Sequence, residues 1–349
     1  MPAVLRREEK LLVGYAAVAH GFVHVLELTY AAILPFLLLE FGEGLFVLGV
    51  VATFFGLAFG LGALPAGVLA DRIGSKRLVE ICLLGGAAAS VGVALSPNIY
   101  FLAASLSVLG LVLGLYHPAG NSLISRGVRQ RAVGRGMAAH GIGGSLGTAS
   151  APILAAGVAA LFDWRVAYLV PAALSVLAAV AILRTSAMTP SMDKAPEPAP
   201  AASANPGHIL LLPLIVVFAV FTINGFIYRG MITFLPLHLK ENVNFAIGGI
   251  DAVALAGGFT TFALLAGIPG QWLGGTLGDR IHREVVLLAQ ALAMASILLL
   301  MGVVSGLPLV AVGAMMGVSY FMAQPLTTGL IADYTPRHLQ GRMFGIGFF

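Results

Sequence analysis

Long apolar runs with almost no charge recur along the whole chain, and they restrict what it can fold into. Eighteen or more consecutive apolar residues are enough for a helix that crosses a bilayer, and about ten such runs are present. Only 10% of the 349 residues are charged, whereas a soluble domain carries about 25%. A surface with so few charges has to face lipid. The sequence therefore predicts an all-α, polytopic membrane protein.

Short polar connections separate the predicted spanning helices. The first run is too long for the apolar part of a signal peptide, so we interpret it as a span. We expect spans at residues 11–39, 45–70, 78–95, 99–124, 135–160, 165–184, 209–237, 252–277, 284–304 and 307–332, with an eleventh that begins near Gly341.

Lysine and arginine fall almost entirely on one side of this predicted topology. Of the 19 basic residues, 16 lie on the side of the N-terminus, Arg165 and Lys240 lie on the other side, and Arg229 lies within a span. Because basic residues are retained in cytoplasmic loops, we expect a bacterial inner-membrane protein with a cytoplasmic N-terminus. The basic residues are then orientation signals, and no nucleic-acid binding is expected despite the net charge of +4.

A stretch rich in proline, alanine and serine divides the chain. Residues 185–207 have no helical periodicity and too many prolines for an ordered element. We expect this stretch to be a cytoplasmic linker between an N-terminal six-helix half at 1–184 and a C-terminal half at 208–349.

The two predicted halves share a repeated segment. The sequence GVLADRIGSKR at 67–77 follows the second span, and GTLGDRIHR at 275–283 follows the eighth. A proline then follows each copy at nearly the same distance, Pro118 in the first half and Pro325 in the second. Repeated halves of this kind are typical of secondary transporters. By this repeat the second half stops within its fifth span, which predicts a truncated half and about 10.5 helices.

The repeated segment resembles the loop signature of the major facilitator superfamily. The tripeptide Asp163-Trp164-Arg165 and the glycine-rich stretch 141–147 are also similar to that superfamily. The resemblance implies the major-facilitator fold of two six-helix halves, in which spans 1, 4, 7 and 10 line a central cavity.

Within the superfamily, the segment 115–118, followed by Arg126, resembles the fosmidomycin-resistance branch of drug efflux proteins. That branch implies an acidic residue near position 24, where this chain has His24. The acidic residue stands one turn later, at Glu27.

Ionisable residues at membrane depth are costly, so they usually face the protein interior and have a function. His20, His24 and Glu27 follow one another at i, i+4 and i+7, on one face of the first span. We predict that Glu27 carries the coupling proton and that the two histidines relay it or set the pKa of Glu27. The alternative is that Glu27 pairs with a histidine or with Arg229 and only holds the helices in register.

Polar residues on the predicted cavity-lining spans are the candidate substrate contacts. Arg229 cannot deprotonate, so it suits an anionic substrate group or a counter-ion to Glu27, unless it snorkels to an outer interface. His117 either contacts the substrate or a gate, or makes a hydrogen bond at the proline kink. The full set is Arg229, His117, Tyr30, Asn121, Asn224, Tyr228 and Gln324. His140, in the fifth span, is expected to have a gating or structural role.

The duplicated loop is a candidate gate. Gly67 is predicted to allow two helices to approach closely, and Asp71 to pair with a nearby arginine or a helix N-terminus. Such a pair can break and reform during transport, although a plain connecting loop would show the same charges. The loop residues are Gly67, Asp71, Arg72, Gly74, Lys76, Arg77, Asp279 and Arg280.

These features predict a proton-coupled secondary transporter that exports small organic compounds, antibiotics among them. Uptake of an organic anion recognised by Arg229 is the alternative. A membrane-embedded enzyme and a non-transporting sensor are remote alternatives. The enzyme would cluster its acidic residues, which are scattered here, and the sensor would usually carry a long soluble tail. There is no phosphate-binding P-loop motif for ATP use, and the single cysteine, Cys82, allows no intrachain disulfide. We expect a monomer whose partners are a small-molecule substrate, protons and lipid, with no metal or other cofactor.

Overall fold

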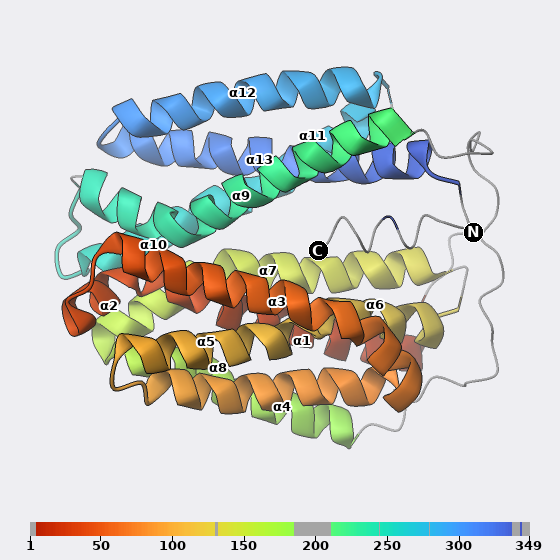
Figure 1. Ribbon diagram of the computed structural model, residues 1–349, viewed down its shortest axis with the longest axis horizontal. Coiled ribbons are helices and arrows are strands. Elements are labelled where there is room, and N and C mark those ends of the chain that lie inside the picture. Colours follow the sequence, from red (N-terminus) through yellow and green to blue (C-terminus); the bar gives the residue numbers. More distant parts are fainter. Residues whose placement is uncertain are drawn as a thin grey trace. The chain divides into compact units, whose positions relative to one another are not determined.

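The computed structural model describes residues 5–129, 132–184, 211–243, 245–278, 280–336 and 343, and in this part of the chain the regular structure is helical (Figure 1). The helices are α1 (Arg7–Ala32), α2 (Leu34–Phe41), α3 (Leu45–Ile73), α4 (Ser75–Ala94), α5 (Ile99–Gly114), α6 (Tyr116–Gly127), α7 (Val133–Leu161), α8 (Trp164–Leu183), α9 (Leu211–Asn242), α10 (Ala252–Leu265), α11 (Gly267–Gly278), α12 (Arg283–Val303) and α13 (Leu307–Tyr334).

Ten helical segments among the described residues are long and apolar enough to cross a membrane. Each of the ten predicted spans overlaps one of them, so the all-α polytopic architecture is confirmed. The predicted linker at 185–207 lies outside the described residues, and so does Gly341, where the eleventh span was expected to begin.

Prolines interrupt three of the apolar runs. Proline has no backbone N–H, and its ring clashes with the carbonyl four residues earlier, so a helix tends to break just before it. The first run is therefore two helices and not the single helix predicted for 11–39. The breaks fall at Ile33, Leu115 and Ala266, two or three residues before Pro35, Pro118 and Pro269. The second break places His117 in the first turn of α6.

The first compact unit comprises Met1–Ala199. In it α1 packs along α7, α3 along α5, and α4 along α8 (Figure 1). Glycines allow α1 and α7 to touch through their backbones. A Cβ added at Gly143 would lie 2.2 Å from the carbonyl oxygen of Ala17, and one at Gly147 would lie 2.3 Å from that of Gly21. Small residues serve the same purpose in other membrane helix pairs.

The second compact unit comprises Pro200–Phe349. Helices α9, α10, α11 and α12 all pack against α13. Part of its core is a cluster of buried aliphatic residues that includes Leu214, Val217, Leu287 and Leu330. Large apolar side chains such as Trp272 are exposed, as expected for a surface that lipid covers.

The internal repeat extends to individual packing contacts. A Cβ at Gly62 would lie 2.0 Å from the carbonyl oxygen of Leu111. In the second unit a Cβ at Gly270, 208 residues after Gly62, would lie 2.2 Å from the carbonyl oxygen of Val318. A second contact is duplicated in the same way: Gly110 with Phe55, and Gly317 with Ala263. The two units are therefore built around the same two backbone contacts.

The interpretation of Gly67 as a close-packing residue is wrong for the described part of the chain. A Cβ at Gly67 would meet nothing within 4 Å, and the residue is exposed. The close approach occurs more than one helical turn earlier, at Gly62, because that residue faces α5.

Candidate functional site

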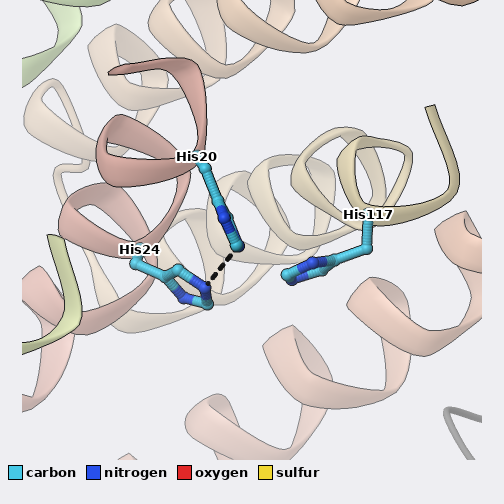
Figure 2. A group of neighbouring side chains, drawn as sticks. All are labelled: His20, His24 and His117. Atoms are coloured by element: carbon cyan, nitrogen blue, oxygen red, sulfur yellow. Dashed lines mark hydrogen bonds between the residues drawn. The ribbon is translucent and has the colours of Figure 1, made fainter. Parts of the chain in front are cut away.

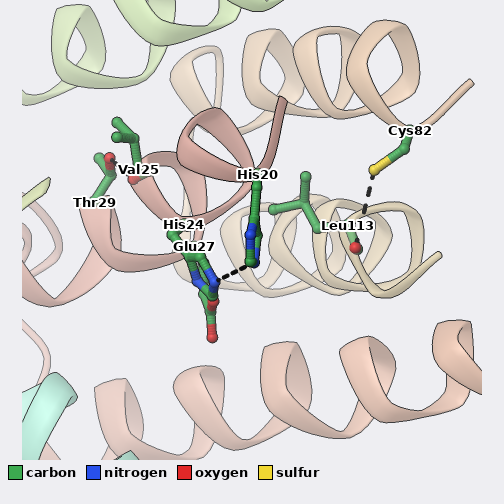
Figure 3. Close-up of polar contacts among 7 residues, drawn as sticks. All are labelled: His20, His24, Val25, Glu27, Thr29, Cys82 and Leu113. Atoms are coloured by element: carbon green, nitrogen blue, oxygen red, sulfur yellow. Dashed lines mark hydrogen bonds and ion pairs between the residues drawn. The ribbon is translucent and has the colours of Figure 1, made fainter. Parts of the chain in front are cut away.

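Three predicted residues of α1 form a continuous polar chain. His24 Nδ1 lies 2.9 Å from Glu27 Oε2, and His24 Nε2 lies 3.1 Å from His20 Nε2 (Figure 3). The helical spacing brings the three side chains to one face, as predicted. Glu27 is only 7% exposed and His20 only 9%, so the carboxyl group is buried beside an imidazole and not in open water.

His20 is held against α7. Its Nδ1 lies 3.0 Å from the backbone carbonyl oxygen of His140, and the two rings stack with centroids 4.2 Å apart. The space that the His20 ring fills exists because residue 144 is glycine. A Cβ there would lie 2.4 Å from Cε1 of the ring. The glycines of the fifth span therefore both bring helices together and make room for the imidazole ring of His20.

Tyr116 joins the same cluster, although its role was not predicted. Its hydroxyl donates to the carbonyl oxygen of Ala16, and His140 Nε2 lies 3.1 Å from the hydroxyl oxygen. Since the hydroxyl hydrogen is used by Ala16, His140 Nε2 is the donor in the second contact. Tyr116 thus connects α1, α6 and α7. A tyrosine next to His117 in an apolar run was the available signal, but its partners lie on other helices.

His117 brings a third imidazole to the cluster. Its ring meets that of His20 edge-on, with centroids 5.1 Å apart, and lies 5.4 Å from that of His24. One nitrogen from each of the three rings lies within 4.8 Å of the others (Figure 2). Among the described residues, this is the group of histidine, cysteine and acidic side chains that could hold a metal ion.

The remaining predicted cavity residues of the first unit have different surroundings. The Tyr30 hydroxyl donates to the carbonyl oxygen of Leu48 at 2.8 Å, and the side chain is buried. Tyr30 therefore connects α1 to α3. Asn121, on α6, is exposed.

In the second unit the predicted residues lie on α9 and α13. Tyr228 stacks on Tyr320 with centroids 4.8 Å apart, and Gln324 accepts a hydrogen bond of 2.9 Å from Gln271 Nε2. Asn224 and Arg229 are partly exposed on α9. The structure thus brings α9, α11 and α13 together through polar and aromatic contacts.

The duplicated loop makes an ion pair with another helix end. Asp71, near the end of α3, accepts from Arg126, near the end of α6. Gly74 connects α3 to α4 with φ 90°, a conformation that favours glycine. Lys76 lies 3.9 Å from Glu80. The other loop residues, Arg72, Arg77 and Arg280, are exposed, and Asp279 lies outside the described residues.

Further ion pairs at helix ends, among them one in each unit, were not predicted. Glu9 accepts from Nε and Nη2 of Arg129 at 2.7 and 2.8 Å, which connects the start of α1 to the α6–α7 connection. This hydrogen-bonded carboxylate raises the pKa of Arg129. In the second unit Arg283 lies 2.5 Å from Asp333. From the sequence, these arginines were predicted only to set membrane orientation.

Sequence relatives include named transport and resistance proteins. The chain is 32% identical over 184 residues to the Multidrug resistance protein B homolog of Mycobacterium tuberculosis, which is 51% of this chain and 32% of that relative. It is 25% identical over 290 residues to the Probable sulfoacetate transporter SauU of Cupriavidus necator, which is 78% of this chain and 66% of that relative. The chain thus spans about a third of the length of the multidrug-resistance relative.

Solved structures of the same fold are transporters with low sequence identity. A bacterial homolog of the human lysosomal transporter Spinster has a TM-score of 0.76 at 12% identity, covering 98% of this chain and 79% of that one. The xylose transporter XylE of E. coli has a TM-score of 0.71 at 14% identity, covering 97% and 85%. The family model of the Major Facilitator Superfamily matches residues 16–349. The chain therefore belongs to the Major Facilitator Superfamily, as its loop signature predicted.

Proposed function

We propose that this protein is a secondary transporter that exports small organic compounds in exchange for protons by alternating access. Membership of the superfamily and similarity to a multidrug-resistance relative support transport over an enzymatic role. The observation that carries the coupling proposal is the buried chain Glu27–His24–His20 on α1. The protein is proposed to lie in a bacterial inner membrane with its N-terminus in the cytoplasm. It is proposed to work as a monomer.

The hydrogen-bond directions among Glu27, His24 and His20 support a single transferable proton. A carbonyl oxygen can only accept, so His20 Nδ1 carries a hydrogen and the Nε2 of its neutral ring has a lone pair. His24 Nε2 then has to donate to it. The remaining proton lies between His24 Nδ1 and Glu27, as an imidazolium–carboxylate pair or as a neutral imidazole and carboxylic acid. Removing it would leave two lone pairs facing each other, so proton release has to rearrange the chain.

For the substrate, we propose contacts in each unit by itself, from α6 in the first and from α9 and α13 in the second. His117 adjoins the proton chain, so substrate arriving there would affect the same group that takes the proton. Tyr228 of α9, stacked on Tyr320 of α13, offers an aromatic face. Polar groups are offered by Asn224 and Arg229 on α9 and by Gln324 on α13. Such a mixture suits small organic molecules with both apolar and polar parts.

A second candidate function is the uptake of a small organic anion. The similarity to a probable sulfoacetate transporter favours it, and so does Arg229, which stays charged and can pair with an acidic group. In that function the proton would accompany the substrate. Direction and substrate charge therefore distinguish the two proposals.

The proposal is tested in an efflux-deficient bacterium that expresses the protein. Tolerance to a panel of antibiotics, fosmidomycin included, is compared for wild type, Glu27→Gln and Glu8→Gln. The last is the control, since Glu8 lies on the same helix but is exposed. We expect raised tolerance with wild type and Glu8→Gln, and at least a tenfold smaller effect with Glu27→Gln, because the amide cannot release a proton.

Two other outcomes are informative. Raised tolerance that survives Glu27→Gln would keep export and remove Glu27 as the coupling group. Unchanged tolerance to every compound, with the protein present in the membrane, would contradict drug export. Proton-driven accumulation of a labelled sulfonate or carboxylate by the same cells would then support uptake of an anion.

A further inference from the structure

Three imidazole rings converge in the first unit with the geometry of a metal site. His20 and His24 come from α1 and His117 from the first turn of α6 (Figure 2). One nitrogen of each lies within 4.8 Å of the other two, and the two Nε2 atoms of α1 are 3.1 Å apart. A tetrahedral ion with nitrogen at about 2.0–2.1 Å requires ligand nitrogens about 3.3 Å apart. The two α1 nitrogens are already close to that spacing, and ion binding would draw the His117 ring toward them.

Oxygen atoms next to Nδ1 of His20 and of His24 orient the two rings so that their Nε2 atoms lie close together. A metal-bound histidine nearly always donates its other ring N–H to a carboxylate or a backbone carbonyl. Both arrangements are present: His20 Nδ1 faces the carbonyl oxygen of His140 at 3.0 Å, and His24 Nδ1 faces Glu27 at 2.9 Å. The carbonyl leaves His20 Nε2 without a hydrogen when the ring is neutral, and a nitrogen with a lone pair is the atom that binds a metal. His24 Nε2 donates to His20 Nε2 in the metal-free protein. An ion would replace that proton, and His24 Nδ1 would then donate to Glu27.

The surroundings hold this arrangement in place. The His20 ring lies between the stacked ring of His140 and the backbone at Gly144. The His24 side chain is 14% exposed, whereas that of Glu27 is 5% exposed. The cluster is therefore ordered by packing, while one of its ligands remains accessible to an entering ion. The buried carboxylate also offsets part of the charge of a divalent ion.

We propose that His20, His24 and His117 bind one divalent transition-metal ion of the Zn²⁺ class. An all-imidazole set suits Zn²⁺, Cu²⁺, Ni²⁺ and Co²⁺, and it does not suit Mg²⁺ or Ca²⁺, which prefer oxygen. Three protein ligands leave a fourth position for water or for a donor atom of a bound compound. The inference goes beyond the proposed transport and does not depend on it. Where both hold, the ion takes the place of the proton between the two α1 histidines, so it inhibits transport.

The test measures metal binding by the whole purified protein. The protein is purified with a streptavidin-binding tag, so that no polyhistidine competes. Co²⁺ is added while the ligand-field absorption is recorded, and Zn²⁺ is then titrated by calorimetry. We expect one ion per chain, with a tetrahedral Co²⁺ spectrum that Zn²⁺ abolishes and Mg²⁺ does not.

Variants assign the ligands. His117→Ala and His24→Ala are expected to weaken Zn²⁺ binding at least tenfold, and Glu27→Gln, which alters only the partner of a ligand, by about 10–100-fold. His238→Ala and His282→Ala are the controls, because these histidines lie on α9 and before α12 in the second unit. Both are expected to bind Zn²⁺ as wild type does. Size-exclusion profiles identify variants that fail to fold. If His117→Ala fails to fold, the Zn²⁺ affinity of His24→Ala decides the test.

The proposal is overturned if the wild type gives no tetrahedral Co²⁺ spectrum, or if binding survives both ligand substitutions. It is also overturned if the controls lose binding to the same extent. None of these results depends on transport. Antibiotic tolerance without metal binding would reject the metal site alone, and metal binding without any transport would reject the proposed function alone.

Discussion

At the scale of single residues, the position of the His20 ring depends on a glycine, Gly144, on the neighbouring helix α7. Its ring fills the space above Gly144, and its Nδ1 is fixed by the carbonyl of His140 on the same face of α7. The histidine face of α1 was predictable from its spacing. The partners on α7 were not, because the sequence of α1 contains no information on which carbonyl of another helix lies opposite.

Gly144→Ala therefore tests the placement of His20. A Cβ 2.4 Å from the ring forces His20 to move, and we expect destabilisation of about 1–3 kcal/mol with loss of antibiotic tolerance. Gly141→Ala is the control, since a Cβ there meets nothing within 4 Å. Thermal unfolding and tolerance are measured for both. Equal behaviour of the two variants would contradict the positioning role of Gly144.

At the scale of helices, the spans were predictable because lipid demands long apolar segments, whereas their breaks were not. Pro118 interrupts its apolar run, but Pro65 lies inside the unbroken α3. Which outcome a proline has depends on the contacts of the neighbouring helices. The same limit explains why Gly67 was assigned a packing role that belongs to Gly62.

Substitution of these two glycines separates the packing position from the loop position. In Gly62→Ala the new Cβ would lie 2.0 Å from the carbonyl oxygen of Leu111, and a backbone oxygen cannot rotate away. We expect α3 and α5 to separate and the yield of folded protein to fall at least tenfold. Gly67→Ala should fold as wild type does. Fluorescence-detected size-exclusion chromatography measures both, and a normal profile for Gly62→Ala would refute the contact.

At the scale of the whole molecule, the two units repeat a packing scheme but differ in their charges. The first has Asp71 paired with Arg126, and the second has Arg283 paired with Asp333. The end of the fourth span thus carries the base in one unit and the acid in the other. The repeat itself was predictable from the duplicated loop. The ion pairs were not, since the positive-inside pattern explains the arginines equally well.

The end of the fourth span accommodates a base in one unit and an acid in the other, so we predict that the first pair tolerates exchange. We expect Asp71→Arg and Arg126→Asp to reduce antibiotic tolerance singly, because each places like charges together, and the double exchange to restore at least half of it. Both side chains are more than 40% exposed, so little change in thermal stability is expected. If the double exchange is as inactive as the single ones, the Asp71–Arg126 pair is not part of a gate.

In the proposed mechanism the Glu27 carboxyl group exchanges one proton for substrate. Everted membrane vesicles whose pH gradient is followed with an acridine dye measure this exchange. A compound to which the protein gives tolerance is added after the gradient has formed. We expect the compound to collapse the gradient partly with wild type and Glu8→Gln, and to leave it unchanged with Glu27→Gln. An equal collapse with Glu27→Gln, or none with wild type, would contradict it.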